Sequence, residues 1–118
     1  MSEFENDYSA GRKEGFTPEI DRMVHEPARY LIMAYLYVVE SADFIYLLHH
    51  TRLTKGNLSS HLMKLEEAGY VEVEKTFVDR VPRTLLSLTP GGRAALDAYR
   101  ASLQLMLKGP AKPRAKGK

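Results

Sequence analysis

The sequence contains no cysteine, which excludes a disulfide framework, a thiolate metal site and a cysteine nucleophile. It also lacks any apolar run near the roughly 18 residues that a membrane-spanning helix requires. The polar, acidic start MSEFENDYS is unlike a secretory signal peptide. These absences predict a cytoplasmic protein with no membrane partner.

Catalytic motifs are missing as well. The chain shows no set of nucleophile, base and orienting group, and its carboxylates are scattered rather than paired. Gly91-Gly92 falls at an expected helix start and does not form a phosphate-cradling motif. His49 and His50 are adjacent, so they cannot share one helical face as a metal clip would require. We therefore expect neither an enzyme nor a bound metal or other cofactor.

The chain has the length and composition of one globular domain, with 118 residues of which 44% are hydrophobic and 27% charged. Its net charge of +2 is unevenly distributed, because the last eleven residues, KGPAKPRAKGK, contain five basic residues and no acid. Such a segment has too few apolar residues to fold and is expected to be attracted to polyanions, although a solubilising terminus has the same composition. We predict a loosely ordered arm over residues 1–16, a folded domain over 17–107 and a disordered basic tail over 108–118.

Helical periodicity and capping residues predict the first part of the domain. A short helix after Thr17-Pro18 precedes a main helix over residues 27–39. Asp43 is placed to cap a second helix, and Thr54 is placed to cap a third helix that ends at Gly69. The predicted start of the domain is therefore entirely helical.

Beyond Gly69 the apolar period changes from about 3.6 to about 2. The alternating run from Val71 to Phe77 and the apolar run over residues 84–88 predict a β-hairpin, with Pro82 at its tip or margin. Thr89-Pro90 repeats the cap-then-proline signal and predicts a last helix to about Leu107. The fold is predicted to be mainly α with a small β-hairpin.

Two stretches, LTKGNLSSHLMKLEEAGYVEVEK and VPRTLLSLTPGGRAAL, resemble the winged helix-turn-helix transcriptional regulators related to the MarR and ArsR repressors. The resemblance extends from about His25 to Leu96. It is specific in the small polar third helix ending in LEEAGYV, the basic hairpin with Pro-Arg-Thr, and the sequence LTPGGR at the start of the last helix. It implies a winged helix fold and a homodimer that binds double-stranded DNA, the hairpin being the wing.

The third helix has the composition of a helix that enters the DNA major groove. Leu58, Leu62 and Leu65 form its buried stripe, and the opposite side is small and polar. Asparagine can pair bidentately with adenine, and arginines of a following hairpin suit phosphate or a narrow minor groove. The polar positions could equally be solvated, and His61 could pack beside the buried stripe. The predicted DNA contacts are Thr54, Lys55, Gly56, Asn57, Ser59, Ser60, His61, Lys64, Lys75, Arg80 and Arg83.

Apolar residues of the last helix follow the 3-4-3 spacing of a helix–helix seam. Packing of this helix on its own domain is the alternative, but it leaves Leu105 and Leu107 without an obvious burial site. We expect a homodimer formed through the terminal helices. The predicted interface residues are Ile20, Met23, Val24, Leu96, Tyr99, Leu103 and Met106.

These features predict a sequence-specific regulator of transcription, most simply a repressor, that binds a pseudo-palindromic operator as a homodimer. A winged helix that serves only as a protein-interaction module is the alternative. A small-molecule pocket lined by Tyr30, Tyr35, Tyr37 or Tyr46 is a further alternative, although such tyrosines more often complete a core. Metal-sensing relatives in the ArsR group use cysteines, or histidine and carboxylate clusters, on the last helix. Residues 93–107 contain no histidine, which argues against metal sensing.

Overall fold

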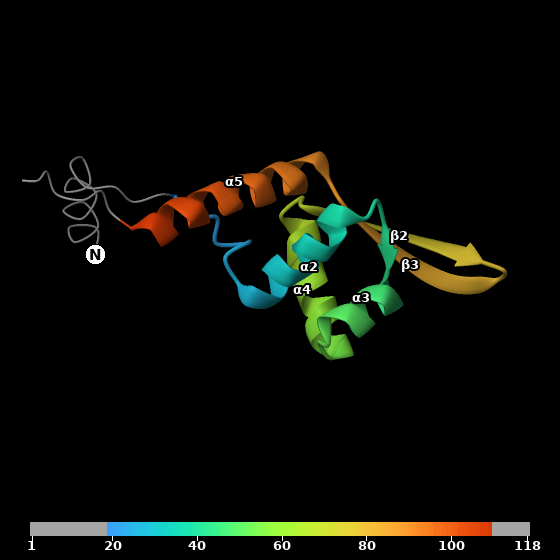
Figure 1. The fold of residues 1–118 in the computed structure, drawn as a ribbon. Helices are drawn as coiled ribbons and strands as arrows, with labels where there is room; N and C mark the ends of the chain where they lie inside the picture. The colour runs from blue at the N-terminus through green and yellow to red at the C-terminus, as the bar shows by residue number, and fades with distance from the viewer. Residues whose placement is uncertain (1–18, 110–118) are drawn as a thin grey trace, which may run out of the picture. The chain divides into compact units, whose positions relative to one another are not determined.

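The computed structural model describes residues 19–109. Within them lie four α-helices and one three-stranded antiparallel sheet (Figure 1). In chain order the elements are α2 (Pro27–Val38), β1 (Ala42–Asp43), α3 (Phe44–Thr51), α4 (Lys55–Glu67), β2 (Val71–Val78), β3 (Val81–Leu88) and α5 (Pro90–Lys108). Residues 21–99 form one compact unit, and residues 100–109 belong with residues 19–20 to a second. None of the helices in the described range is long and apolar enough to cross a membrane.

Side-chain caps start the three helices of the helix-turn-helix region. The Glu26 carboxylate accepts a hydrogen bond from Arg29 N (2.8 Å) and Pro27 occupies the first position of α2. Asp43 Oδ1 accepts from Tyr46 N (2.8 Å), and Thr54 Oγ1 accepts from Asn57 N (3.1 Å). The caps predicted at Asp43 and Thr54 are therefore confirmed.

Apolar side chains from all these elements share one core within residues 21–99. The predicted stripe of α4 is confirmed, since Leu58, Leu62 and Leu65 are buried. The other fully buried large side chains are Val24, Ile32, Met33, Leu36, Leu47, Leu86 and Leu96. Burial of this stripe leaves the opposite side of α4 exposed to solvent.

The predicted hairpin is present, but its strands are longer and its turn is shorter than expected. Strands β2 and β3 pair from Val71↔Leu88 to Val78↔Val81, so the connection is only Asp79-Arg80. Both turn residues have positive φ (52° and 67°), as in the tight turns whose twist matches that of paired strands. Pro82 lies one residue from the turn, at the predicted margin.

A third strand, β1, was not predicted. Its two residues pair with β3 as Ala42↔Leu86 and Asp43↔Leu85, which places β3 in the middle of the sheet. The free end of β3 lacks a partner on that side, so Pro82 disrupts no ladder there. A two-residue strand has too little periodicity to be seen in a sequence.

The short helix predicted through Ile20, Met23 and Val24 is wrong for the described residues. Residues 22–24 form a single turn, in which Asp21 Oδ1 accepts a hydrogen bond from Met23 N (2.8 Å). The side chain of Asp21 thereby satisfies an amide that a helix would otherwise use. The predicted start at Thr17-Pro18 and the arm over residues 1–16 lie outside the described residues, as does the tail beyond Gly109.

Tyr70 joins three parts of the unit. Its amide donates to Leu65 O at the end of α4 (2.9 Å), and its carbonyl accepts from Thr89 N just before α5 (3.0 Å). Its hydroxyl donates to Asp21 Oδ2 (2.5 Å) in the N-terminal turn. Gly92 of α5 lies directly against the Tyr70 backbone, where a β-carbon would collide with the carbonyl group.

This contact predicts that Gly92→Ala lowers the free energy of unfolding by about 1–3 kcal/mol, since the backbone must move to admit the methyl group. Gly91→Ala is the matched control, because its β-carbon would lie 3.7 Å from the nearest atoms and alanine favours a helix. Urea denaturation of the two variants measures the difference. Equal losses in both variants would contradict the close approach at Gly92.

The hydrogen bond to Asp21, reinforced by burial and by the charge of that carboxylate, raises the pKa of Tyr70 from 10.0 to about 12. A raised pKa stabilises the fold fully below the unfolded value of 10 and is lost as the pH rises towards 12. The stability advantage of the unaltered protein over Tyr70→Phe should therefore shrink between pH 9 and pH 11.5, about the span of this titration. Denaturant titrations at both pH values test this, and a constant difference would refute it.

Candidate nucleic-acid interface

The exposed side of α4 presents most of the residues predicted to contact DNA. Thr54, Lys55, Gly56, Asn57, Ser59, Ser60 and Lys64 are all exposed. The Oγ1 atom of Thr54 is occupied as the cap of α4, whereas the first amides of the helix point out of its N-terminus. The face therefore offers small polar side chains beside free backbone donors.

His61 differs from the other predicted contacts on α4. Its side chain is 19% exposed and packs against the start of α2. Its Nδ1 atom lies 3.3 Å from Arg29 Nη1 and 4.0 Å from Glu26 Oε1. This position matches the packing alternative for His61, and a DNA contact by this residue stays a prediction.

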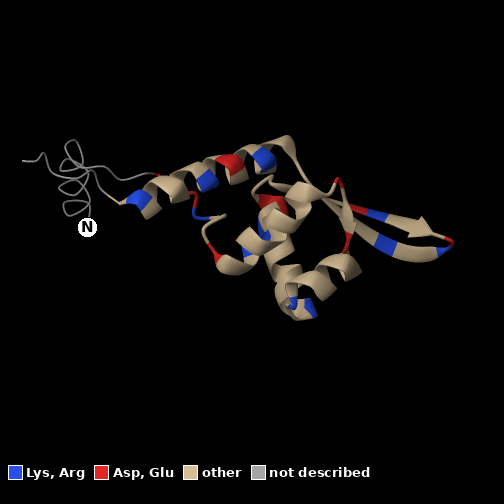
Figure 2. Cartoon of the chain, in the orientation of Figure 1, with Lys and Arg blue, Asp and Glu red and all other residues tan. Residues whose placement is uncertain are grey.

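The wing carries the other predicted contacts, Lys75, Arg80 and Arg83, all exposed. Figure 2 shows the basic segments of the hairpin towards its free end. Arg80 lies in the turn itself, whereas Arg83 Nη1 donates to Asp43 Oδ2 (2.7 Å). Arg83 is therefore partly neutralised, and Arg80 is the more accessible cation.

Asp43 connects the wing to the helices through both of its carboxylate oxygens. Oδ1 accepts from Tyr46 N at the start of α3, while Oδ2 accepts from Arg83 of β3. The sequence indicated Asp43 only as a helix cap, because the pairing of β1 with β3 that brings it to Arg83 could not be seen. This ion pair stabilises the wing against α3.

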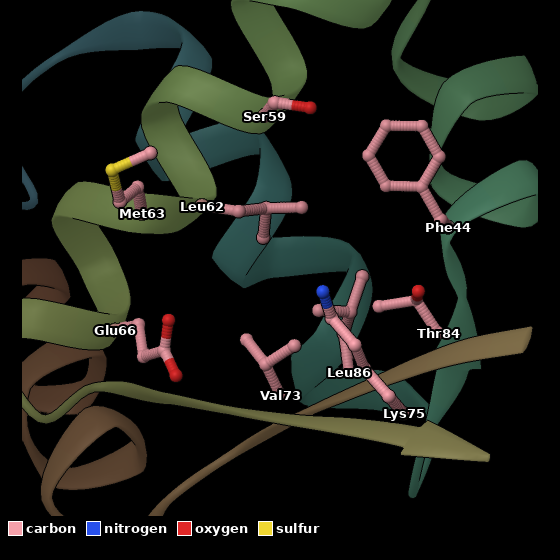
Figure 3. A pocket seen from close by; sticks show the side chains of 9 residues that line it. All are labelled: Phe44, Ser59, Leu62, Met63, Glu66, Val73, Lys75, Thr84 and Leu86. Atoms are coloured by element: carbon pink, nitrogen blue, oxygen red, sulfur yellow. The ribbon is translucent and has the colours of Figure 1, made fainter.

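A groove of about 520 Å³ separates α4 from the wing (Figure 3). Its walls come from α4, the start of α3 and strands β2 and β3. Most of its lining is apolar, and the amine of Lys75 points into it from β2. The residues that line it are Phe44, Ser59, Leu62, Met63, Glu66, Val73, Lys75, Thr84 and Leu86.

The residues predicted to form a dimer interface fall into two groups. Val24, Leu96 and Tyr99 are buried within the chain, and the Tyr99 hydroxyl lies 2.9 Å from His25 Nδ1. At Leu96 and Tyr99 the 3-4-3 spacing thus accompanies burial in the chain's own core. Ile20, Met23 and Leu103 are half-buried. Met106 is exposed, together with its neighbours Leu105 and Leu107.

The four tyrosines of the alternative ligand pocket lie in different contacts. Tyr35 and Tyr46 meet edge to face, with 6.4 Å between ring centroids, whereas Tyr30 lies against Tyr99. Tyr37 donates to Asp97 Oδ1 of α5 (2.7 Å). None of the four lines the groove between α4 and the wing. Between residues 19 and 109 no cluster of three histidine or carboxylate side chains could hold a metal ion.

Sequence reasoning missed Arg52, which lies in the turn between α3 and α4. It adopts a left-handed conformation (φ 63°), and its amide donates to Leu48 O (3.2 Å) as the C-cap of α3. Glycine is the usual residue at such a cap, so an arginine gave no signal for it. Its exposed side chain adds a cation close to the start of α4.

Three helices followed by a β-hairpin and a last helix define a winged helix-turn-helix domain. The family model for the winged helix DNA-binding domain matches residues 28–107, and the chain belongs to that family. The predicted resemblance is thereby confirmed, and the family is one of DNA-binding domains rather than of enzymes.

Known proteins resemble the chain both in sequence and in structure. An uncharacterised protein of Methanocaldococcus jannaschii is 38% identical over 78 residues, covering 66% of this chain and 85% of that protein. A transcriptional regulator homologue from Pyrococcus horikoshii OT3 shares the fold with a TM-score of 0.71 and 32% identity, over 75% of this chain and 88% of that one. A MarR-family regulator from Silicibacter pomeroyi has a TM-score of 0.54 and 28% identity, over 78% and 63% of the two chains.

Gly56 allows protein stability and DNA affinity to be separated. A β-carbon at this position would meet no atom within 4 Å. Gly56→Ala should therefore raise the free energy of unfolding by about 0.5–1 kcal/mol, the usual gain of alanine in a helix. If the backbone approaches DNA here, affinity for duplex DNA should fall by roughly tenfold, or about 1.4 kcal/mol. Denaturation and duplex titration measure the two effects, and unchanged or tighter binding would contradict a close approach.

Proposed function

We propose that the protein is a sequence-specific transcriptional regulator, acting as a repressor, that binds a pseudo-palindromic operator as a homodimer. The observation that supports this most is the pairing of a small polar face on α4 with a basic wing across one groove. An α-helix fits the major groove of B-DNA, and a hairpin beside it meets the adjacent backbone or minor groove. The family to which the chain belongs supports the same function.

In this proposal α4 is the element that recognises bases. Asn57 and Ser60 are exposed on its free side and carry the hydrogen-bonding groups that distinguish base edges. The amides at the start of α4 and the side chain of Lys55 face the phosphate backbone, which positions the helix without selecting a sequence. Specificity then depends on a few short side chains held by the buried leucine stripe.

The wing supplies the electrostatic part of binding. Arg80 lies at the turn of the hairpin, and none of the contacts described within residues 19–109 neutralises it. Arg83 keeps further N–H donors, but its ion pair with Asp43 gives it a structural task as well. We therefore assign to Arg80 the main phosphate contact of the wing.

A homodimer would place two copies of α4 about one helical turn of DNA apart. The exposed side chains of Leu105, Met106 and Leu107 at the end of α5 are apolar and have the character of a surface that a second chain covers. A dimer bound across a promoter would repress transcription by excluding polymerase. The Pyrococcus horikoshii neighbour, described as a transcriptional regulator homologue, is consistent with this role.

Selection of bound duplexes from a random DNA pool tests the function directly. An enriched inverted repeat would support both sequence-specific binding and the twofold dimer. Binding without enrichment of any sequence would refute a specific regulator. Failure to bind duplex DNA at low salt would instead favour a protein-interaction module.

Two substitutions should then separate base recognition from anchoring. Asn57→Ala should cost roughly 1–3 kcal/mol on the selected site and relax discrimination at one base position. Arg80→Ala should weaken every duplex by a similar factor and reduce the salt dependence by about one unit per lost phosphate contact in each subunit. Titrations against the selected and a scrambled duplex at several salt concentrations measure both. Loss of discrimination in Arg80→Ala but not in Asn57→Ala would place recognition in the wing.

A further inference from the structure

The free end of the wing exposes a cluster of apolar side chains. Phe77 is 62% exposed, Val81 52% and Val78 46%, and Pro82 beside them is also exposed. Single exposed apolar residues are common, but a cluster of this kind typically marks a binding surface. The core of the domain does not require them, because the sheet is already anchored through Val71 and Leu86.

The pairing register divides this cluster between the two faces of the hairpin. Side chains alternate along a strand, so Lys75 and Phe77 share one face while Val78 lies on the other. Directly opposite partners share a face, which adds Pro82 to Phe77 and Val81 to Val78. Lys75 lines the groove beside α4 (Figure 3). Phe77 therefore extends the groove-side face of the wing towards its tip.

Charge around Phe77 indicates the chemistry of its partner. Residues 75–83 contain three basic side chains, Lys75, Arg80 and Arg83, against one acidic side chain, Asp79. An apolar ring surrounded by cations suits a surface that combines phosphates with apolar sugar faces. The minor groove of DNA is such a surface, with walls of deoxyribose and rims of phosphate, and apolar side chains enter it in other proteins.

We propose that Phe77 is an apolar contact of the wing with DNA, packed against the deoxyribose wall of the minor groove next to the major-groove site of α4. The inference rests on the proposed function, which supplies the duplex. Pro82 stiffens the strand opposite Phe77, because its ring restricts the backbone. Arg80 at the turn then lies over the phosphates, and Phe77 supplies contact that charge alone does not give.

Such a contact has a signature that differs from that of a cation. Burying an aromatic side chain removes apolar surface from water and releases no counterions. Loss of Phe77 should therefore lower the affinity without changing its dependence on salt, whereas loss of Arg80 should change both. The two kinds of contact on one hairpin can be separated by the same titrations.

The experiment compares Phe77→Ala with Val78→Ala, a matched control on the neighbouring but opposite-facing position. On the selected duplex, Phe77→Ala should bind roughly five- to twentyfold more weakly with an unchanged salt slope, as expected for partial burial of an aromatic ring. Val78→Ala should bind within about twofold of the unaltered protein, since surface substitutions rarely have larger effects. Phe77→Leu, which keeps an apolar side chain, should recover most of the affinity. Hydroxyl-radical footprints of the complexes should lose protection of minor-groove sugars outside the α4 site only in Phe77→Ala.

Other outcomes overturn the inference. If Phe77→Ala binds and protects DNA as the unaltered protein does, the ring does not touch DNA and the proposed function stands without it. If Val78→Ala is impaired equally, the opposite face of the hairpin contacts DNA or the wing has been distorted generally, and the assignment of Phe77 fails. If the unaltered protein binds no duplex, the proposed function falls together with this contact, and the cluster belongs to a protein partner.

Discussion

The backbone at Tyr70 is the constraint on which the remaining geometry depends. Hydrogen bonds of one residue join the end of α4, the chain before α5 and the N-terminal turn, and Gly92 closes against the same carbonyl group. Because β2 begins at the next residue, the direction in which the wing leaves α4 is set at this point. A helix that recognises bases and a hairpin that anchors to the backbone are useful together only if their relative position is constant.

A second constraint acts where the wing leaves the helices. Asp43 caps α3 with one oxygen and holds Arg83 with the other, so a single carboxylate couples the hairpin to the helix-turn-helix region. The pair is partly exposed and would contribute little as an isolated surface ion pair. Its value is geometric, because β1 already aligns the two strands and the ion pair restricts what movement remains.

Local signals predicted most of the elements and much of the candidate site. The caps at Asp43 and Thr54, the leucine stripe of α4 and the start of α5 follow from short-range hydrogen bonding and helical periodicity. What failed were contacts between distant residues. The spacing at Leu96 and Tyr99 indicated a partner helix, yet both residues are buried in the chain's own core, because apolar spacing does not state which surface will cover it.

The sequence by itself determined the fold class, the polar face of α4 and the concentration of basic residues on the wing, since these depend on neighbours a few positions away. Only the tertiary structure decided that Arg83 is tied to Asp43, that His61 packs against α2, and that Phe77 lies on the side of the wing that faces the groove. Such facts depend on strand register and on pairs far apart in the chain. A shift of register by one residue would move Phe77 to the opposite face with no change in the sequence.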